Sequence, residues 1–252
     1  MAAAAALAWS PVSAGGCGPS PDVVDVVACR LDVSPAEVRQ LRDLLAPDEV
    51  ARALRLRPGH LRDAFVVGRG RLRQILGFAV GCPPGTLCLG VDPGGKPRLD
   101  GPPGERLRFN VSHSRGLMLC AVGVDRPVGI DVEHVSLDTE WEDLATRFLA
   151  PAERRAIAAL PLAARRGAFF DCWTRKEAVL KATGDGLARP LDSFAVSVDP
   201  QQAEVLACDP ALGRPESWLL APLPVGPDYR AAVAVHEGRW TVSVRRWAWD
   251  RG

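Results

Sequence analysis

The chain has 252 residues, of which 47% are hydrophobic and 24% charged, and its formal net charge is +1. This size and composition are typical of a globular protein with one large domain or two modest ones. The near-neutral charge argues against a dedicated nucleic-acid-binding protein, and no apolar run approaches the roughly 20 residues that span a bilayer. Seven cysteines without a CxxC pair indicate free thiols in a reducing compartment, so we expect a cytoplasmic protein.

The first 21 residues carry no charged side chain and are rich in Ala, Gly, Ser and Pro. They lack the basic start of a secretion signal, and we interpret them as a disordered leader. An organellar transit peptide fits less well, because arginine is missing from this stretch.

In the next hundred residues, helices are expected to precede strands. Ser34-Pro-Ala-Glu37 has the form of a capping box with proline at the first helical position, which predicts a helix through Leu45. A long helix is expected over 61–79, where apolar residues recur at helical spacing. An apolar run over 117–124 is typical of a strand buried on both faces. The other strands are expected near 86–91 and 106–112.

The rest of the chain repeats this order after a turn near 124–127. Helices are expected near 140–148, 151–160 and 165–183. Strands are expected near 193–199, 217–221, 230–236 and 240–247.

Two segments recur at one offset. LAPDE at 45–49 returns as LAPAE at 149–153, 104 positions later, and the same offset aligns the 16 residues from Arg62 with those from Arg166. A shared offset indicates a duplication. We therefore predict an α+β fold of two similar subdomains, over 22–125 and 126–252.

Lysine is rare in this chain. Among 31 basic residues there are three lysines, Lys96 in GGKP and Lys176 and Lys181 in WTRKEAVLK. Lysine is a compact point charge, whereas arginine is a planar fork, so these positions favour lysine for its shape. Chance clustering in an arginine-rich chain is the alternative. The glycines before Lys96 could bring backbone N–H groups to a phosphate, or form a plain turn.

The segment PVGIDVEHV has strict alternation, which places Asp131 and Glu133 on the strand face opposite Val128, Ile130 and Val132. Their α-carbons are then roughly 7 Å apart. The pair is either a solvated strand face or part of a magnesium site, since Mg²⁺ takes one or two carboxylates and fills its other positions with water and phosphate oxygens.

On the helix from Arg165, Trp173, Glu177 and Lys181 follow at four-residue steps and share a face. Glu177 and Lys181 could form an ordinary helix-stabilising pair. However, this helix is apolar on more than one side, which indicates that its charges face a cleft.

The segment FNVSHSRG predicts a strand end followed by a polar turn, with Asn110 and Ser112 on one face and His113 at the lip. A Ser-His hydrolase is excluded here, because adjacent strand residues point to opposite faces and no GxSxG motif is present. Seven arginines between Arg52 and Arg73 are opposed by Asp63 alone. This run is either a solvated helix face or a contact for an acidic partner or a phosphate.

Taken in order, GGKP, FNVSH, GIDVE and WTRKEAVLK resemble the Sfp-type 4′-phosphopantetheinyl transferases, over roughly 45–240. The resemblance implies a monomer with two similar α/β halves in a pseudo-two-fold arrangement and an active site between them. It implies transfer of the phosphopantetheine arm of coenzyme A to a serine of an acyl or peptidyl carrier protein. Adenosine 3′,5′-bisphosphate is then released.

The same resemblance assigns roles to individual residues. Asp131, Glu133 and Glu177 would hold Mg²⁺, with Mn²⁺ as an alternative, against the pyrophosphate of coenzyme A. Glu177, or a carboxylate-bound water, would take the proton of the carrier serine. Lys181, with Lys176 as a second candidate, would stabilise the departing phosphate.

Further residues would contact coenzyme A. His113 would lie near its 3′-phosphate, and an early cationic contact would be Arg52, with Arg69 as a further candidate. The full set of expected coenzyme A contacts is Arg52, Lys96, Pro97, Ser112, His113, Asp131, Lys176 and Lys181.

Carrier proteins are acidic around their modified serine, so a basic docking face is expected, and the Arg52–Arg73 run is one candidate. The carriers could serve fatty acid, polyketide or nonribosomal peptide synthesis. No nucleic-acid or membrane partner is expected. Two other functions would use similar groups, namely a Mg²⁺-dependent hydrolase of coenzyme A or nucleotide pyrophosphates and a non-catalytic coenzyme A binding regulator.

Overall fold

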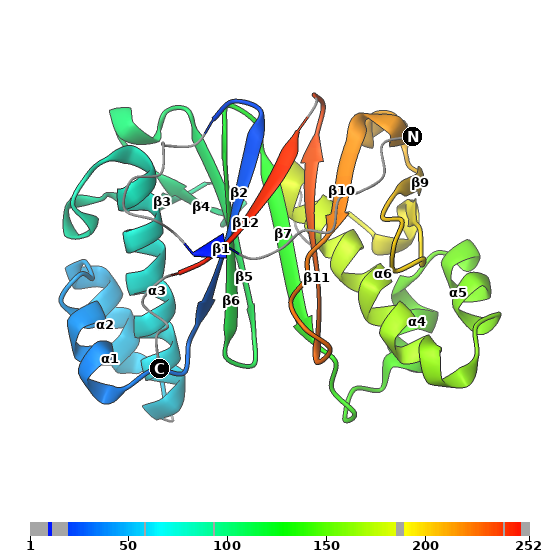
Figure 1. Cartoon of the computed structure of the whole chain (residues 1–252), viewed down its shortest axis with the longest axis horizontal. Helices are drawn as coiled ribbons and strands as arrows, with labels where there is room; N and C mark the ends of the chain where they lie inside the picture. The colour runs from blue at the N-terminus through cyan, green and yellow to red at the C-terminus, as the bar shows by residue number, and fades with distance from the viewer. Residues whose placement is uncertain are drawn as a thin grey trace.

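In the computed structural model, two main sheets lie face to face between two groups of helices (Figure 1). This arrangement refers to the residues that the structure describes, which are 10–11, 20–57, 59–92, 94–184, 189–238 and 240–247. Within these ranges no helix is long and apolar enough to cross a membrane.

The first group of helices packs beside the first sheet. Helix α1 (Pro35–Arg42) has Ser34 as its N-cap, and Ser34 Oγ accepts the N–H of Glu37 at 3.3 Å, which confirms the Ser34 half of the predicted capping box. The Glu37 carboxylate instead accepts a hydrogen bond from Arg71. Helix α1 ends at Arg42, before the predicted Leu45. The next two helices are α2 (Pro47–Arg55) and α3 (Gly59–Val80). Helix α3 was predicted over 61–79, whereas α2 was not predicted.

The first sheet has the order β1-β12-β2-β6-β5. Its strands are β1 (Ser10–Pro11), β2 (Val23–Arg30), β5 (Leu107–Ser114), β6 (Leu117–Val124) and β12 (Thr241–Arg246). A small hairpin of β3 (Leu89–Val91) and β4 (Pro97–Leu99) lies next to it. Strand β2 was not predicted.

The second sheet has the order β10-β11-β7. These strands are β7 (Val128–His134), β10 (Trp218–Pro222) and β11 (Tyr229–His236). The helices beside it are α4 (Trp141–Phe148), α5 (Pro151–Ala158) and α6 (Leu162–Thr183). A short pair, β8 (Ala195–Val196) and β9 (Val205–Ala207), follows α6, and the single-turn 3₁₀ helices are Pro84–Thr86, Pro102–Gly104, Leu191–Ser193, Pro210–Leu212 and Pro215–Ser217.

The two sheets share one internal order. Strands β2-β6-β5 in the first correspond to β7-β11-β10 in the second, and each has a helix of 22 residues beside it, α3 or α6. The repeated LAPxE segment caps the start of α2 in the first half and of α5 in the second. Glu49 accepts the N–H of Ala46 at 2.8 Å, and Glu153 accepts that of Ala150 at 2.7 Å. These matched elements support a duplication. Strand β12, however, pairs with β2, so a boundary at 125/126 does not separate the two sheets.

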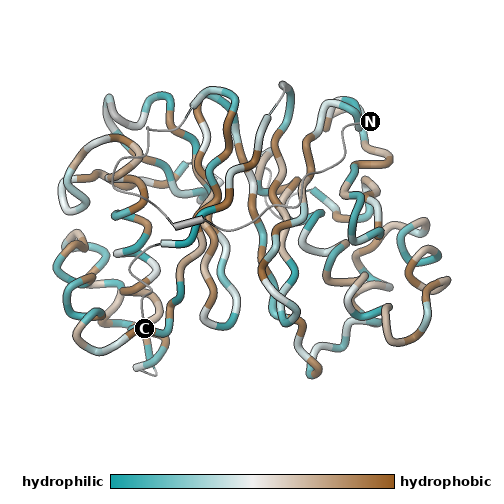
Figure 2. Tube along the Cα trace, in the orientation of Figure 1, coloured by the Kyte–Doolittle hydropathy of each residue, from teal (hydrophilic) through white to brown (hydrophobic). Residues whose placement is uncertain are grey.

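Four apolar cores are present among the described residues; one packs α1 and α2 against α3, and the other three hold the layers together. One fills the space between the sheets and includes Val26, Val128, Ile130 and Val132, each completely buried. The second lies between the first sheet and α3, and the third between the second sheet and α6. Figure 2 shows hydrophobic residues running along the central strands. The apolar face predicted for β7 is therefore confirmed.

Most of the predicted leader lies outside the described residues. The exception in its middle is Ser10–Pro11, which forms β1 and pairs in parallel with Arg245–Arg246 of β12. The structure thus has a short strand at these two residues, within the segment that the sequence predicted to be a disordered leader.

Helix α6 packs tightly against strand β7 at Gly129. A Cβ atom placed there would lie 1.9 Å from the backbone oxygen of Ala178 and 2.4 Å from the backbone nitrogen of Ala182. Real Cβ atoms essentially never come so close to backbone atoms, so this contact depends on glycine. It brings the polar face of α6 against the polar face of β7.

We predict that Gly129→Ala forces α6 away from β7 and lowers the free energy of unfolding by about 1 to 3 kcal/mol, as overpacking does. Chemical denaturation measures this effect. Gly123→Ala in β6 is the matched control, because its added methyl group would meet nothing closer than Arg126 O at 3.9 Å. Equal denaturation midpoints for the two variants would contradict the prediction.

Candidate active site

Asp131 lies at the centre of a polar cluster between β7, β5 and α6. Its Oδ1 accepts hydrogen bonds from Lys181 Nζ at 2.6 Å and from Ser112 Oγ at 2.8 Å. Lys181 also donates to Ser112 Oγ at 3.2 Å. Three residues from three separate sequence motifs therefore meet at one carboxylate.

The strands β5 and β7 lie side by side, although each is the last strand of its own sheet. Side chains of β5 accept N–H groups of β7, with Asn110 bonded to Ile130 at 2.9 Å, Ser112 to Val132 at 3.3 Å and Ser114 to His134 at 3.1 Å. Both residue numbers rise together, so the strands are parallel. We call this row of contacts the β5–β7 seam.

Glu133 and Glu177 complete the acidic side of the cluster. Both are half-buried, and the Ser114 hydroxyl donates to Glu133 Oε2 at 2.9 Å. Burial, and then the charge of Asp131, raises the pKa of Glu133. The same two causes raise the pKa of Glu177, and Lys181 partly offsets them. The carboxylates thus repel one another, and a further cation would relieve that repulsion.

The donor set fits a hard divalent cation. Asp131 Oδ2 is buried and has no hydrogen-bond partner, so one ligand oxygen is already free of competing protein groups. The described residues form no preassembled group of three metal-ligating side chains. Mg²⁺ suits such a site, because it typically uses one or two carboxylates and completes its shell with water and substrate phosphates.

Lys96 links the β3–β4 hairpin to the second half of the molecule. Its Nζ donates to the backbone oxygens of Lys181 at 2.6 Å and Val128 at 3.1 Å. Burial lowers the pKa of Lys96 to about 8, although the charge of Asp92 acts in the opposite direction.

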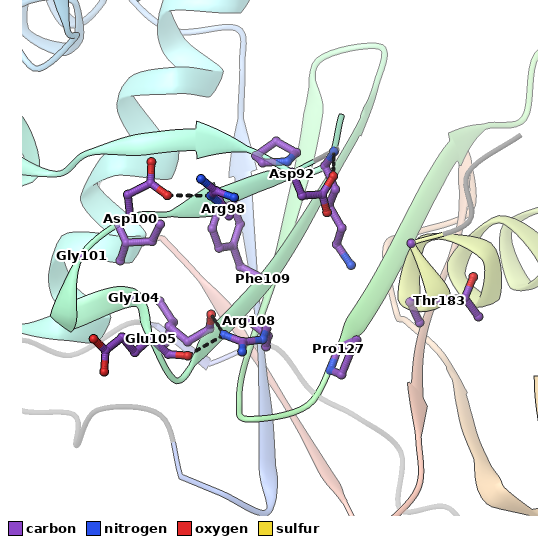
Figure 3. Close-up of a pocket in the computed structure, with 16 residues that line it drawn as sticks. Asp92, Arg98, Asp100, Gly101, Gly104, Glu105, Arg108, Phe109, Pro127 and Thr183 are labelled. Atoms are coloured by element: carbon purple, nitrogen blue, oxygen red, sulfur yellow. Dashed lines mark hydrogen bonds and ion pairs between the residues drawn. The ribbon is translucent and has the colours of Figure 1, made fainter. Parts of the chain in front are cut away.

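A pocket of about 470 Å³ opens beside Lys96 and Pro97 (Figure 3). Arg98, Arg108 and Thr183 also line it. Asp92, Asp100 and Glu105 line it as well, so its wall carries charges of both signs beside the end of α6. His113 is exposed at the end of β5 and accessible to a ligand.

Lys176 does not face the cleft. Its side chain is completely buried, and Nζ donates to Glu153 Oε1 at 2.6 Å and to the backbone oxygen of Phe194 at 2.5 Å. The predicted contact of Lys176 with coenzyme A phosphates does not fit this position. Lys176 instead neutralises the buried capping glutamate of α5.

The early arginines are also placed differently from the predicted run. Arg69 and Arg73 both bind Glu49, at 2.5 Å and 2.7 Å, and Arg71 is buried against Glu37. Arg71 and Arg73 are buried and Arg69 is half-buried, so the run does not form one basic face. The sequence did contain signals for these ion pairs. They are a glutamate at a helix start, the four-residue spacing of Arg69 and Arg73, and the apolar residues beside them. Arg52 is exposed on α2 with its guanidinium 5.2 Å from the centre of the Phe65 ring, and no described hydrogen bond or ion pair joins it to the cluster.

Two functional positions were missed from the sequence. Ser114 contacts Glu133, and Gly129 permits the approach of α6. Alternation along β5 could have indicated Ser114, because it shares a face with Asn110 and Ser112.

Carboxylates, a lysine and a pocket with cationic groups are the components that enzymes acting on phosphate groups use. A family model described as the 4′-phosphopantetheinyl transferase superfamily matches residues 127–234. The 4′-phosphopantetheinyl transferase HetI of Nostoc sp. is 38% identical over 224 residues, which cover 87% of this chain and 90% of that protein. The chain therefore belongs to the 4′-phosphopantetheinyl transferase superfamily, and the resemblance stated from its motifs is confirmed.

Other relatives match over shorter spans. A 4′-phosphopantetheinyl transferase of Bacillus subtilis is 35% identical over 139 residues, covering 54% of this chain and 60% of that protein. The 4′-phosphopantetheinyl transferase Sfp of Bacillus subtilis is 36% identical over 91 residues, covering 35% and 38%. The enzyme class is the same in each.

We predict that Lys176→Met destabilises the fold by about 3 to 5 kcal/mol, because it leaves a buried carboxylate without its cation. Chemical denaturation measures the loss. The double variant Glu153→Gln/Lys176→Met, which removes both charges, should recover part of it. A Lys176→Met protein as stable as the wild type would show that the buried pair is unimportant.

Proposed function

We propose that this phosphopantetheinyl transferase uses coenzyme A as donor and modifies a serine of an apo acyl or peptidyl carrier protein, with Mg²⁺ held by Asp131, Glu133 and Glu177. The convergence of Asp131, Glu133, Glu177 and Lys181 between β7 and α6 carries this proposal. Mn²⁺ is a second candidate for the metal. The enzyme would act as a cytoplasmic monomer.

Glu177 is the proposed general base. Its raised pKa brings it closer to the operating pH, where a carboxylate accepts a proton more effectively. The carrier serine is a poor nucleophile as a neutral hydroxyl, so removal of its proton during attack lowers the barrier. A water held by the carboxylates is the alternative carrier of this proton.

Lys181 is proposed to stabilise charge on the departing adenosine bisphosphate. It is held at Asp131 and Ser112 before substrate binds, and such preorganised cations need little rearrangement as charge develops. When bound, the metal ion neutralises charge on the attacked phosphate.

Coenzyme A is proposed to contact Lys96 and Pro97 at the pocket, with His113 near its 3′-phosphate. Ser112 would act differently from a simple substrate contact, because its hydroxyl already donates to Asp131. Arg52 remains a proposed 3′-phosphate contact.

The acidic carrier is proposed to meet a narrower basic face than the whole arginine run. Arg52, Arg55 and Arg57 are exposed near the end of α2. Long-range attraction to an acidic partner mainly raises the rate of encounter.

The deciding experiment is incubation of the protein with coenzyme A, Mg²⁺ and several apo carriers, followed by intact mass spectrometry of each carrier. We expect the added mass of one phosphopantetheine on at least one carrier. Cleavage of coenzyme A without any modified carrier would overturn the proposal in favour of hydrolysis.

Glu177→Gln should reduce the transfer rate by about 100-fold or more, which is typical of losing a general acid or base. Coenzyme A should still bind, as isothermal titration calorimetry can test. Near-normal turnover in this variant would remove Glu177 from its assigned role.

Coenzyme A affinity should fall as the pH rises through about 8, because the pKa of Lys96 is lowered to about 8. Below this value the ammonium attracts the phosphates, and above it the amine is neutral. Dissociation constants measured between pH 7 and pH 9.5 test the effect. Lys96→Met is the control and should show a weaker affinity with a flatter dependence; the same slope in both proteins would contradict the assignment.

A further inference from the structure

The β5–β7 seam uses different side chains at its three positions. Asn110, Ser112 and Ser114 alternate along β5, and each accepts an N–H from the β7 residue that follows 20 positions later. An amide oxygen and a hydroxyl oxygen serve equally well for this purpose. Joining the strands therefore does not explain why two positions carry serine.

The second bond of each serine supplies the explanation. A hydroxyl that accepts an N–H still has its own proton to donate. Ser112 donates to Asp131 Oδ1 at 2.8 Å, and Ser114 donates to Glu133 Oε2 at 2.9 Å. Each serine thus bonds one N–H of β7 and the carboxylate of the residue before it. Asn110 bonds the N–H of Ile130, and the residue before Ile130 is Gly129, which has no carboxylate. Hydroxyls thus occur beside the carboxylates.

The two carboxylates differ in how many groups hold them. Asp131 is bonded by Ser112 and also by Lys181. Among the described residues, Ser114 provides the one hydrogen bond to the Glu133 side chain. Loss of the Ser114 hydroxyl would therefore release Glu133, whereas Asp131 has a second partner.

We propose that Ser114 is a positioning residue that fixes the Glu133 carboxylate toward the metal and phosphate side of the cleft. It acts through Glu133 and does not contact coenzyme A. This role rests on the proposed function, in which Glu133 is a metal ligand. Hydrogen bonds to a ligand's unused oxygen orient the ligand, and their removal typically lowers metal affinity or activity about 10- to 100-fold.

The test compares Ser114→Ala with Ser114→Thr, which keeps the hydroxyl. Binding of Mn²⁺ is measured by electron paramagnetic resonance with coenzyme A present and no carrier, so turnover does not contribute. We expect Ser114→Ala to weaken Mn²⁺ binding about 10-fold or more, with a matching rise in the Mg²⁺ concentration for half-maximal transfer. Ser114→Thr should bind Mn²⁺ within about twofold of the wild type, since the orienting hydrogen bond is retained.

Asn110→Ala is the matched control, because it also removes a seam hydrogen bond but touches no carboxylate. It should lose stability at least as much as Ser114→Ala while keeping Mn²⁺ affinity. If it weakens Mn²⁺ binding as much as Ser114→Ala does, the effect belongs to the seam and the proposal is overturned. Unchanged Mn²⁺ binding in Ser114→Ala, or failure of Ser114→Thr to restore it, also overturns the proposal.

Crystal structures of the two Ser114 variants give a readout without metal or activity. The Glu133 side chain should keep its position in Ser114→Thr and leave it in Ser114→Ala. An unmoved Glu133 in Ser114→Ala overturns the positioning role, whatever the carrier assay shows. Absence of transfer by the wild type would instead overturn the proposed function, so the two failures are distinguishable.

Discussion

The pairing of β5 with β7 through side chains is the interaction on which the site depends. An edge strand has N–H groups that require partners, and here Ser112 and Ser114 provide them instead of a neighbouring backbone. Because a hydroxyl both accepts and donates, the same atoms that join the two sheets also hold Asp131 and Glu133. The same two hydroxyl groups therefore join the halves and orient the carboxylates. A substitution that removes either hydroxyl changes both the contact between the sheets and the position of a carboxylate in the cleft.

The duplicated halves have kept one feature and diverged in another. Both retain a buried glutamate that caps a helix, and each binds a cation of the following long helix. At the offset of 104, however, Arg73 occupies the position of Glu177. Arg73 is turned inward to Glu49, whereas Glu177 lies beside the polar face of β7. At this position α3 thus contributes a buried ion pair, whereas α6 contributes a carboxylate to the cleft.

The features that sequence reasoning predicted correctly are those with a local period. Alternation over residues 128–134 defined the faces of β7, and four-residue steps placed Glu177 and Lys181 on one face of α6. The interior position of Lys176 could not be predicted in this way, because its partner Glu153 belongs to another helix and reaches it only through tertiary packing. The unpredicted strand β2 and the return of β12 to pair with it are likewise set by contacts distant in the sequence. The rarity of lysine in this chain therefore does not by itself identify a residue of the active site, as Lys176 shows.

The pairing of β12 with β2 also determines the order in which the molecule can be completed. Strand β2 is made early and β12 is made after every other strand that the structure describes, yet they form a parallel pair inside the first sheet. Until β12 emerges from the ribosome, β2 has an open edge, and such edges are prone to pair with other chains. Closing this contact also brings together segments separated by most of the chain, which slows folding. The risk of misassembly is therefore greatest during synthesis, after β2 has formed and before β12 is available to cover its edge.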